Sequence, residues 1–231
     1  SGADDLMNSK RWFWTGMMEV EDQSSGSYQR FIEAYAACCA FADAQLGRVL
    51  DALDASPRGK ETIVVLWSDH GFHLGEKDHI EKFALWEKAN RIPMIVVAPG
   101  VTTPGSVCNA PVDLTALYPT LLELAGLPED SRADGDSLVP QLKNPDHERP
   151  SPALMTYGRG NHAVRTKRWR YIRYADGTEE LYDHELDPEE WTNVASAPEH
   201  VAVLKKHRQW LFMVEADPVA DLKRKPKIKS K

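Results

Sequence analysis

The stretch Thr62-Ile63-Val64-Val65-Leu66-Trp67-Ser68-Asp69-His70-Gly71 joins an apolar run to a cluster of polar residues. The run 62–67 shows no alternation of polar and apolar side chains. It is too short and too rich in β-branched residues for a helix, so we expect a strand buried on both faces, as in a parallel sheet covered by helices. Because open α/β sheets bind ligands at the carboxyl ends of their strands, residues 68–71 are the first candidate for a functional site.

The segments on either side of this strand have the patterns of helices and of a second strand. Apolar residues recur at steps of three and four from Phe31 to Leu53, which predicts a long amphipathic helix. Residues 92–97 form a second apolar run, and Asp113 can cap a helical segment that extends to Leu124. We expect residues 1–27 to be irregular and residues 72–91 to form a polar loop with a short helix near 83–89. The order of these elements indicates an α/β core over residues 1–130.

The sequence after residue 130 has a different character. Residues 131–152 are charged and rich in proline, which is typical of a linker. Strand-like pieces follow near 153–157, 162–166, 169–175 and 179–183, with a hairpin signal at Asp176-Gly177, and an amphipathic helix is predicted at about 199–214. We expect a small antiparallel sheet with a helix packed on it over residues 153–215, and a basic, disordered tail over residues 216–231.

Composition excludes several classes of protein. The chain has 28 basic and 35 acidic residues, but six of the basic ones lie between Lys223 and Lys231. The remaining acidic body lacks the basic face that nucleic-acid binding needs. No run of 18 apolar residues exists that could span a membrane. Cys38, Cys39 and Cys108 form no disulfide framework and identify no compartment, and Cys38 falls on the apolar helical stripe, where we expect it to be buried.

Residues 68–82 hold the densest group of chemically active side chains, with three histidines, four acids and two lysines. A triad of Ser68, Asp69 and His70 is disfavoured, because neighbouring residues that leave a strand point to opposite faces. A zinc site made by His70, His73 and His79 is supported neither by paired cysteines nor by a helical His-x-x-x-His spacing. Neither reading explains the segment well.

A site for a hard divalent cation and an anion explains the same segment better. Asp69 offers carboxylate oxygens, and His70 can contribute a ring nitrogen to the metal or bond to the anion that the metal holds. Lys82 would supply a mobile positive charge toward an oxyanion. Gly71 lets the backbone turn sharply after the strand, where a side chain would obstruct the bound ion.

A series of short motifs begins at this site and continues along the sequence. They are Ser68-Asp69-His70-Gly71, Leu74-Gly75-Glu76, Lys82, Arg91-Ile92-Pro93, Pro119-Thr120-Leu121-Leu122, Gly135-Asp136-Ser137-Leu138-Val139-Pro140, Arg165-Thr166, Trp169-Arg170-Tyr171-Ile172, Glu180-Leu181-Tyr182-Asp183 and Asp187-Pro188-Glu189-Glu190. Each motif is unspecific alone, but their order and spacing resemble the sulfatase family of the alkaline-phosphatase superfamily, most closely its bacterial iduronate-2-sulfatase-type members. The resemblance covers about residues 28–212. It implies the C-terminal part of an alkaline-phosphatase-like sandwich, with a central, mostly parallel sheet between helices.

The resemblance also implies a calcium-dependent hydrolase of sulfate esters that acts on a sulfated sugar, in a periplasmic or secreted bacterial protein. In this family a hydrated formylglycine, made from a cysteine, attacks sulfur, while calcium and cationic side chains hold the sulfate oxygens. Asp69 and His70 match two calcium ligands, and Lys82 matches the lysine that contacts the sulfate and the leaving oxygen. His162 and Arg165 are assigned to substrate binding, with a structural role in a turn as the alternative for His162.

The chain departs from the family pattern at the nucleophile. No cysteine lies in the family's Cys-x-Pro-Ser-Arg motif, and the first pair of metal-binding aspartates is not matched either. We therefore expect a truncated, processed or split product that binds calcium poorly, is inactive alone, and exposes apolar faces where an N-terminal partner chain docks. Two alternatives stay open: a phosphodiesterase or phosphonate monoester hydrolase of the same superfamily, and a non-catalytic module that binds or assembles with a partner chain.

Overall fold

A computed structural model of the 231-residue chain describes residues 12–211 and 215–216. It begins with a helical hairpin made of α2 (Trp12–Gln23) and α3 (Ser27–Asp54). The carboxylate of Glu21 accepts hydrogen bonds of 2.7 Å from the backbone amides of Gly26 and Tyr28, which closes the turn between the helices. Phe13 packs edge-on against Phe31, with 5.8 Å between the ring centroids. The expectation of an irregular N-terminal segment is wrong for these residues, because contacts with α3 hold α2 in place.

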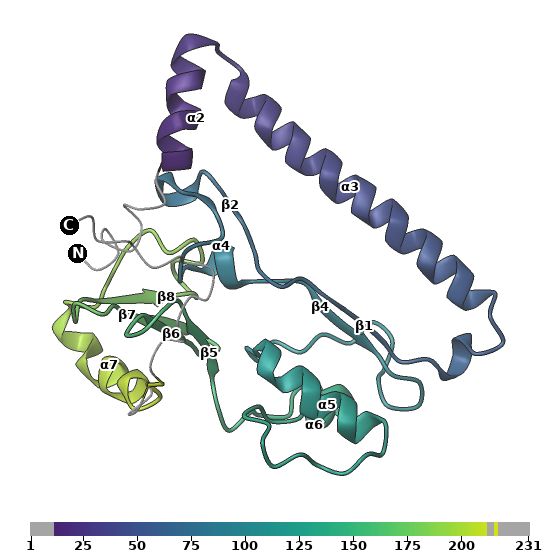
Figure 1. Cartoon of the computed structure of the whole chain (residues 1–231). Helices are drawn as coiled ribbons and strands as arrows, with labels where there is room; N and C mark the ends of the chain where they lie inside the picture. The colour runs from purple at the N-terminus through teal and green to yellow at the C-terminus, as the bar shows by residue number, and fades with distance from the viewer. Residues whose placement is uncertain (1–11, 212–214, 217–231) are drawn as a thin grey trace, which may run out of the picture.

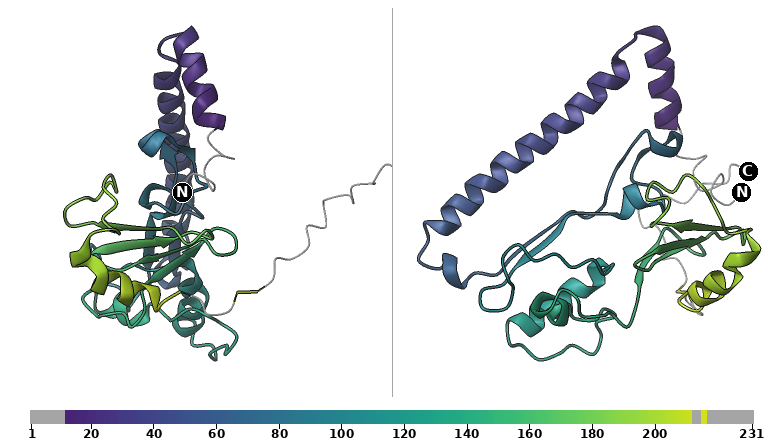
Figure 2. Two further views of the ribbon diagram at one scale, coloured as in Figure 1. Left: turned by 90° about the vertical axis from the view of Figure 1, so that its left-hand side faces the viewer. Right: turned by 180° about the vertical axis from the view of Figure 1, so that it is seen from behind.

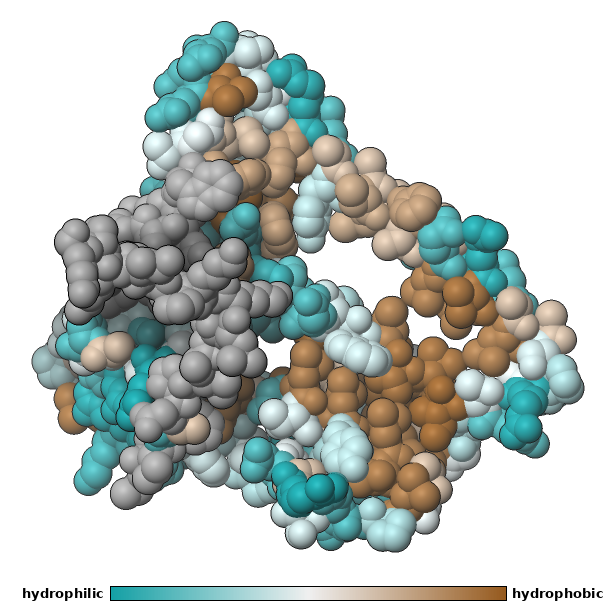
Figure 3. All heavy atoms as spheres, viewed as in Figure 1, coloured by the Kyte–Doolittle hydropathy of each residue, from teal (hydrophilic) through white to brown (hydrophobic). Residues whose placement is uncertain are grey.

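Helix α3 confirms the predicted amphipathic helix, but its apolar stripe is not covered. None of its residues is buried, and Phe41 and Val49 are 68% and 65% exposed. Figures 1 and 2 show α3 as a long helix that runs apart from the strands, and Figure 3 shows apolar surface along it. The expected burial of Cys38 on this helix is wrong, since Cys38, Cys39 and Cys108 are all exposed.

The two apolar runs form the strands β1 (Val64–Trp67) and β4 (Met94–Val97), as predicted. They pair with each other in an antiparallel ladder, with Val64 opposite Val97 and Trp67 opposite Met94. We expected a strand buried on both faces of a parallel sheet, whereas Trp67, Ile95 and Val97 are 47%, 53% and 49% exposed. The pairings within the described residues are antiparallel, and about half of the surface of each of these side chains is left uncovered by this part of the chain.

The segment between β1 and β4 is more ordered than the loop we expected. It contains β2 (His73–Leu74), the 3-10 turn η2 (Glu76–Asp78), β3 (Ile80–Glu81) and the short helix α4 (Glu87–Asn90), which falls near the predicted helix. Strands β2 and β3 pair as an antiparallel hairpin. Ile80 is fully buried and Trp86 is 5% exposed. The hairpin therefore has an apolar anchor of its own, next to the candidate site.

After β4, a helical segment begins at the predicted cap. The Asp113 carboxylate accepts a hydrogen bond of 3.1 Å from the Thr115 amide at the start of η3 (Leu114–Ala116), which leads into α5 (Leu117–Leu124). The buried Thr120 hydroxyl accepts a bond of 2.8 Å from the Leu138 amide, which joins α5 to α6 (Val139–Lys143). Helix α6 lies inside residues 131–152, which we expected to be a linker. We keep the domain boundaries as a proposal, with α6 as an ordered part of that stretch.

The C-terminal part is the antiparallel sheet that the sequence predicts. Its strands β5 (Ala153–Thr156), β6 (His162–Arg165), β7 (Trp169–Arg173) and β8 (Glu179–Asp183) pair in chain order. One face packs on residues 84–89. The other packs on Leu204 of α7 (Val201–Arg208), which follows η4 (Pro198–His200), and on Leu211 beyond that helix. The predicted end of the last helix, at 212–214, and most of the basic tail lie outside the described residues. Within the described part, no helix is long and apolar enough to cross a membrane.

Candidate functional site

A cavity of about 1060 Å³ lies where β1, α4 and the C-terminal sheet meet. Its lining includes Asp69, His70, Lys82 and Arg165, which are four of the five site residues that the sequence suggested. They come from three separate segments: the end of β1, the residue after β3, and the end of β6. The fold therefore brings residues that are up to 96 positions apart in the sequence to one cavity.

The Asp69-His70 pair follows the end of β1, and both residues line the cavity. The His70 Nδ1–H can donate to the Gly71 carbonyl at 2.7 Å, which leaves Nε2 as the nitrogen with a free lone pair. Nε2 lies 3.6 Å from an Asp69 carboxylate oxygen, and the Asp69 side chain is 80% exposed. The Ser68 hydroxyl donates to the His70 backbone carbonyl at 2.7 Å rather than to the ring, so no triad is formed.

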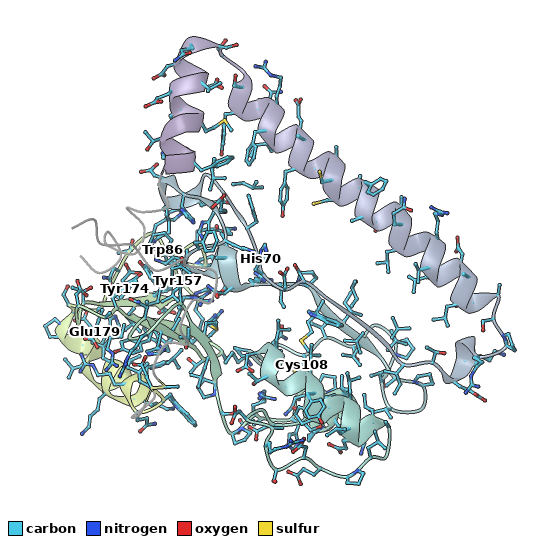
Figure 4. The ribbon with its side chains drawn as sticks, in the orientation of Figure 1. His70, Trp86, Cys108, Tyr157, Tyr174 and Glu179 are labelled. Carbon is cyan, nitrogen blue, oxygen red and sulfur yellow. The ribbon has the colours of Figure 1, made fainter. Side chains whose placement is uncertain are left out.

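Gly71 holds this pair against helix α4. Its amide donates to the Ala89 carbonyl at 2.8 Å. A Cβ atom at position 71 would lie 2.1 Å from the Lys88 carbonyl oxygen and 3.0 Å from the Arg91 carbonyl oxygen. A glycine is needed here because two backbones approach closely, rather than because the chain turns sharply. Figure 4 shows His70 beside α4.

Lys82 follows β3 directly and lines the same cavity. Its ammonium group lies 5.8 Å from the centroid of the Phe83 ring, and its side chain is exposed. The Ala84 amide donates to the Lys82 carbonyl at 2.8 Å, so the backbone of this residue is fixed while the side chain can move. A mobile ammonium group on a fixed backbone suits the contact with an anion that the sequence suggested.

Arg165 reaches the cavity, but the protein itself uses its guanidinium group. Nε forms an ion pair of 3.2 Å with Glu87, and Nη2 lies 3.0 Å from the His184 Nδ1. Nη1 donates to the backbone carbonyls of Thr166 and Lys167. Since each nitrogen has a protein partner, this geometry favours a structural role for Arg165 over direct contact with a substrate.

His162 is the predicted site residue that does not line the cavity. It is 3% exposed, with Nδ1 2.9 Å from the Thr156 hydroxyl and Nε2 3.1 Å from the Glu215 carboxylate. Both ring nitrogens therefore have partners inside the C-terminal sheet region. The position supports the structural reading that the sequence left open, and it gives no support to a substrate-binding role.

Three groups that the sequence reasoning missed lie close together: Glu87 and His184, which are half-buried and line the cavity, and Glu190, which is buried. Ligand atoms of Glu87, His184 and Glu190 lie within 4.8 Å of one another, which by distance alone could hold a metal ion. However, Arg170 forms ion pairs with both carboxylates, at 2.6 Å to Glu190, and is 1% exposed. Burial raises the pKa of Glu87, but the positive charges of Arg170 and Arg165 lower it by more, so the resulting pKa is about 2. The arginines already neutralise these carboxylates, so this is an ion-pair network and a poor cation site.

The two remaining histidines of the dense segment form a separate buried cluster. His73 and His79 are fully buried, with 5.1 Å between their ring centroids, and both pack against Trp86. Burial lowers the pKa of His73 to about 4, so the ring is neutral at neutral pH. Neither ring lines the cavity that contains His70. The three histidines therefore do not converge on a zinc ion.

Comparisons with known proteins show which family the chain belongs to. The family model "Sulfatase" matches residues 9–127, and the model "N-sulphoglucosamine sulphohydrolase, C-terminal" matches residues 75–217. Over 173 residues the chain is 48% identical to a sulfatase of Formosa agariphila, which covers 75% of this chain and 34% of that protein. Over 188 residues it is 36% identical to arylsulfatase K of Gallus gallus, which covers 74% of this chain and 35% of that protein. The chain spans about a third of the length of the curated relatives it matches.

Solved structures with the same fold support this assignment. BT4656 in complex with its substrate D-glucosamine-2-N,6-O-disulfate gives a TM-score of 0.74 at 28% identity, over 79% of this chain and 40% of that one. BT1596, a 2-O GAG sulfatase, gives 0.70 at 27% identity, over 84% and 44%. The phosphonate monoester hydrolase SpPMH from Silicibacter pomeroyi gives 0.63 at 28% identity, over 72% and 37%. These neighbours confirm the α/β, alkaline-phosphatase-like fold class. The sulfatase family model matches more than half of the chain, and the chain belongs to the sulfatase family.

Proposed function

We propose that this chain supplies one wall of the active site of a sulfate-ester hydrolase. The observation that carries the proposal is that Asp69, His70 and Lys82 line one cavity in a chain of the sulfatase family. The three side chains offer a carboxylate, a ring nitrogen and an ammonium group. That combination suits a cation that holds an anion, with a second positive charge on the other side of the anion.

Asp69 and His70 are the residues of this chain that would hold a calcium ion. The hydrogen bond from His70 Nδ1 to the Gly71 carbonyl fixes the ring, and metal-ligating histidines commonly make this kind of bond with their other nitrogen. The Asp69 carboxylate is exposed to the cavity and lies near the free nitrogen of His70. When bound, calcium would supply fixed positive charge to hold the sulfate oxygens. Calcium prefers six to eight ligands, so these two residues make up only part of a site.

Lys82 would act on the departing side of the sulfate ester. Its ammonium group can donate hydrogen bonds to a sulfate oxygen and to the leaving oxygen, where negative charge develops as the S–O bond breaks. The exposed side chain on a fixed backbone lets it follow the substrate into place. Its share of the chemistry is electrostatic stabilisation and, when it carries a proton to the leaving oxygen, acid catalysis.

We further propose that the nucleophile comes from another segment of polypeptide. Cys38, Cys39 and Cys108 do not lie in a Cys-x-Pro-Ser-Arg motif, and the chain spans about a third of its relatives. Exposed apolar side chains on α3 and the β1–β4 ladder, including Phe41 and Ile95, offer a surface that an N-terminal half of the enzyme would cover (Figure 3). The isolated chain is then inactive.

The substrate that the comparisons favour is a sulfated sugar. BT4656 binds a disulfated glucosamine, and BT1596 is described as a 2-O GAG sulfatase. We carry this substrate class to the present chain as part of the proposal, with an iduronate-2-sulfatase-like specificity as its narrower form. The phosphonate monoester hydrolase neighbour supports one alternative, hydrolysis of a phosphonate or phosphate diester by the same fold.

The test compares this chain alone with the chain extended by the sequence encoded upstream of Ser1. With calcium present, we expect the extended protein to hydrolyse an aryl sulfate and sulfated disaccharides, and the chain alone to hydrolyse neither. Lys82→Met in the extended protein should lower kcat by at least ~100-fold, while Lys60→Met, a remote exposed control, should leave kcat unchanged. Turnover of aryl phosphonates in preference to sulfates would establish the alternative. Full activity of the chain alone would overturn the split-site proposal.

A further inference from the structure

The ion-pair network of Glu87, Arg170 and Glu190 lies at the wall of the cavity and connects the C-terminal sheet to the segment that carries the site. Arg170, on the inner strand β7, is 1% exposed and lies at the middle of this network. Its guanidinium group forms ion pairs with Glu87, at the first residue of α4, and with Glu190, which follows β8. A buried arginine of this kind fixes its partners in one geometry, because its planar fork has a defined direction for each bond.

A hydrogen bond from Arg170 ties the sheet to the turn that carries Lys82. Arg170 Nη1 donates to the Leu85 carbonyl at 3.0 Å. The Ala84 amide donates in turn to the Lys82 carbonyl at 2.8 Å, so the turn 82–85 is closed on itself and bound to the sheet. The position of the Lys82 backbone therefore depends on where Arg170 holds Leu85.

The second contact leads to His70. Glu190, held by Arg170, accepts a hydrogen bond of 2.8 Å from the Glu87 backbone amide at the start of α4. Two residues later, the Ala89 carbonyl accepts the Gly71 amide at 2.8 Å. The Gly71 carbonyl accepts the His70 ring at 2.7 Å and sets its orientation. A chain of short contacts thus runs from the sheet through α4 to the imidazole.

We propose that Arg170 is a positioning residue that sets the separation between the Asp69-His70 pair and Lys82. This inference rests on the proposed function, because it gives those three residues a shared task. One guanidinium group holds both the turn that carries Lys82 and the series of contacts that leads to His70. A displacement of this group would therefore move Lys82 relative to the Asp69-His70 pair. Arg170 lines the cavity but is 1% exposed; Nη1 and Nη2 bond to Leu85 and Glu87, and Nε lies 2.6 Å from Glu190 in an ion pair, so Arg170 acts through these partners rather than by contact with the substrate.

The first test reads the His70 ring directly and does not depend on activity. In the chain as it stands, long-range ¹H–¹⁵N spectra should show His70 protonated on Nδ1, as the bond to Gly71 requires. Arg170→Lys keeps the charge but lacks the fork, and it should give the averaged shifts of a ring that exchanges between tautomers. Glu87→Gln, which preserves the shape of the side chain, should act in the same direction. Arg168→Met is the matched control, because Arg168 lies next to the same sheet and pairs with Asp183 instead.

The second test uses the extended, active protein. Arg170→Lys should lower kcat about 30-fold or more and raise the calcium concentration for half-maximal activity about tenfold, while Arg168→Met should change neither by more than about twofold. Wild-type tautomer shifts together with an unchanged calcium requirement in Arg170→Lys and Glu87→Gln would overturn the inference. If the wild-type extended protein has no sulfatase activity, the proposed function fails instead, and the tautomer experiment still decides whether Arg170 orders His70.

Discussion

The substitution Gly71→Ala should separate α4 from the end of β1. The added Cβ would lie 2.1 Å from the Lys88 carbonyl oxygen, whereas real contacts of this kind stay above 3.0 Å. The two backbones must therefore move apart by about 0.9 Å, the difference between these two distances. The hydrogen bond between the Gly71 amide and the Ala89 carbonyl, now 2.8 Å, would then be stretched beyond the normal range of about 2.7–3.2 Å.

The free energy of unfolding should fall for two reasons that add. Overpacking of a well-packed site costs about 1–3 kcal/mol, and the lost backbone hydrogen bond costs about 1 kcal/mol. The sum, about 2–4 kcal/mol, corresponds to a decrease in Tm of roughly 4–16 °C for a chain of this size. The same movement displaces the His70 ring, so the extended protein should also lose most of its activity.

Thermal denaturation followed by circular dichroism measures the effect, with Gly47→Ala as the control. Gly47 lies inside α3, and no atom lies within 4 Å of the place that an added Cβ would take, so alanine there should be neutral or stabilise the helix by about 1 kcal/mol. The reasoning is refuted if Gly71→Ala melts within about 1 °C of the wild type. Equal losses in both variants would show that the effect does not come from the contact with α4.

Three further changes test the buried groups around the site. Burial lowers the pKa of His73 to about 4, below its unfolded value near 6.5. The free energy of unfolding should therefore be at its full value above pH 6.5 and fall by about 3 kcal/mol as the pH drops to 4. Denaturant titrations of His73→Phe should show a weaker pH dependence. Lys77→Met should destabilise the chain by about 1–3 kcal/mol, because the Lys77 ammonium lies 4.6 Å from the Trp86 ring centroid and 3.2 Å from the Tyr182 hydroxyl; urea denaturation measures the loss. His162→Gln should lower Tm but leave KM for a sulfated substrate within about twofold in the extended protein, and a selective rise in KM would restore a substrate-binding role.

Local patterns in the sequence were sufficient for most of the elements. The β-branched run before Asp69 and the 3.6-residue period of α3 predicted a strand and a helix because each pattern needs only its own residues. The hairpin signal at Asp176-Gly177 likewise located the turn between β7 and β8, where Gly177 has a φ of 85°. The prediction of which faces of these elements are buried was wrong. Whether β1 is covered on both faces depends on neighbours that its own sequence does not specify, and in this chain Trp67 is 47% exposed.

The residues of the candidate site also fall into those that the sequence alone could predict and those that it could not. Asp69 and His70 could be found because they follow a predicted strand, where ligands gather. Arg170 lies in the motif Trp169-Arg170-Tyr171-Ile172, but nothing in the sequence shows that it pairs with Glu87, which is 83 positions away. His162 was assigned to substrate binding because it lies near a family motif, whereas its burial and its two protein partners favour the structural alternative. The groups proposed to bind an anion are exposed to the cavity and follow local patterns in the sequence. The groups proposed to hold them in place are paired between segments that are far apart in the sequence, so only the three-dimensional structure brings these partners into view.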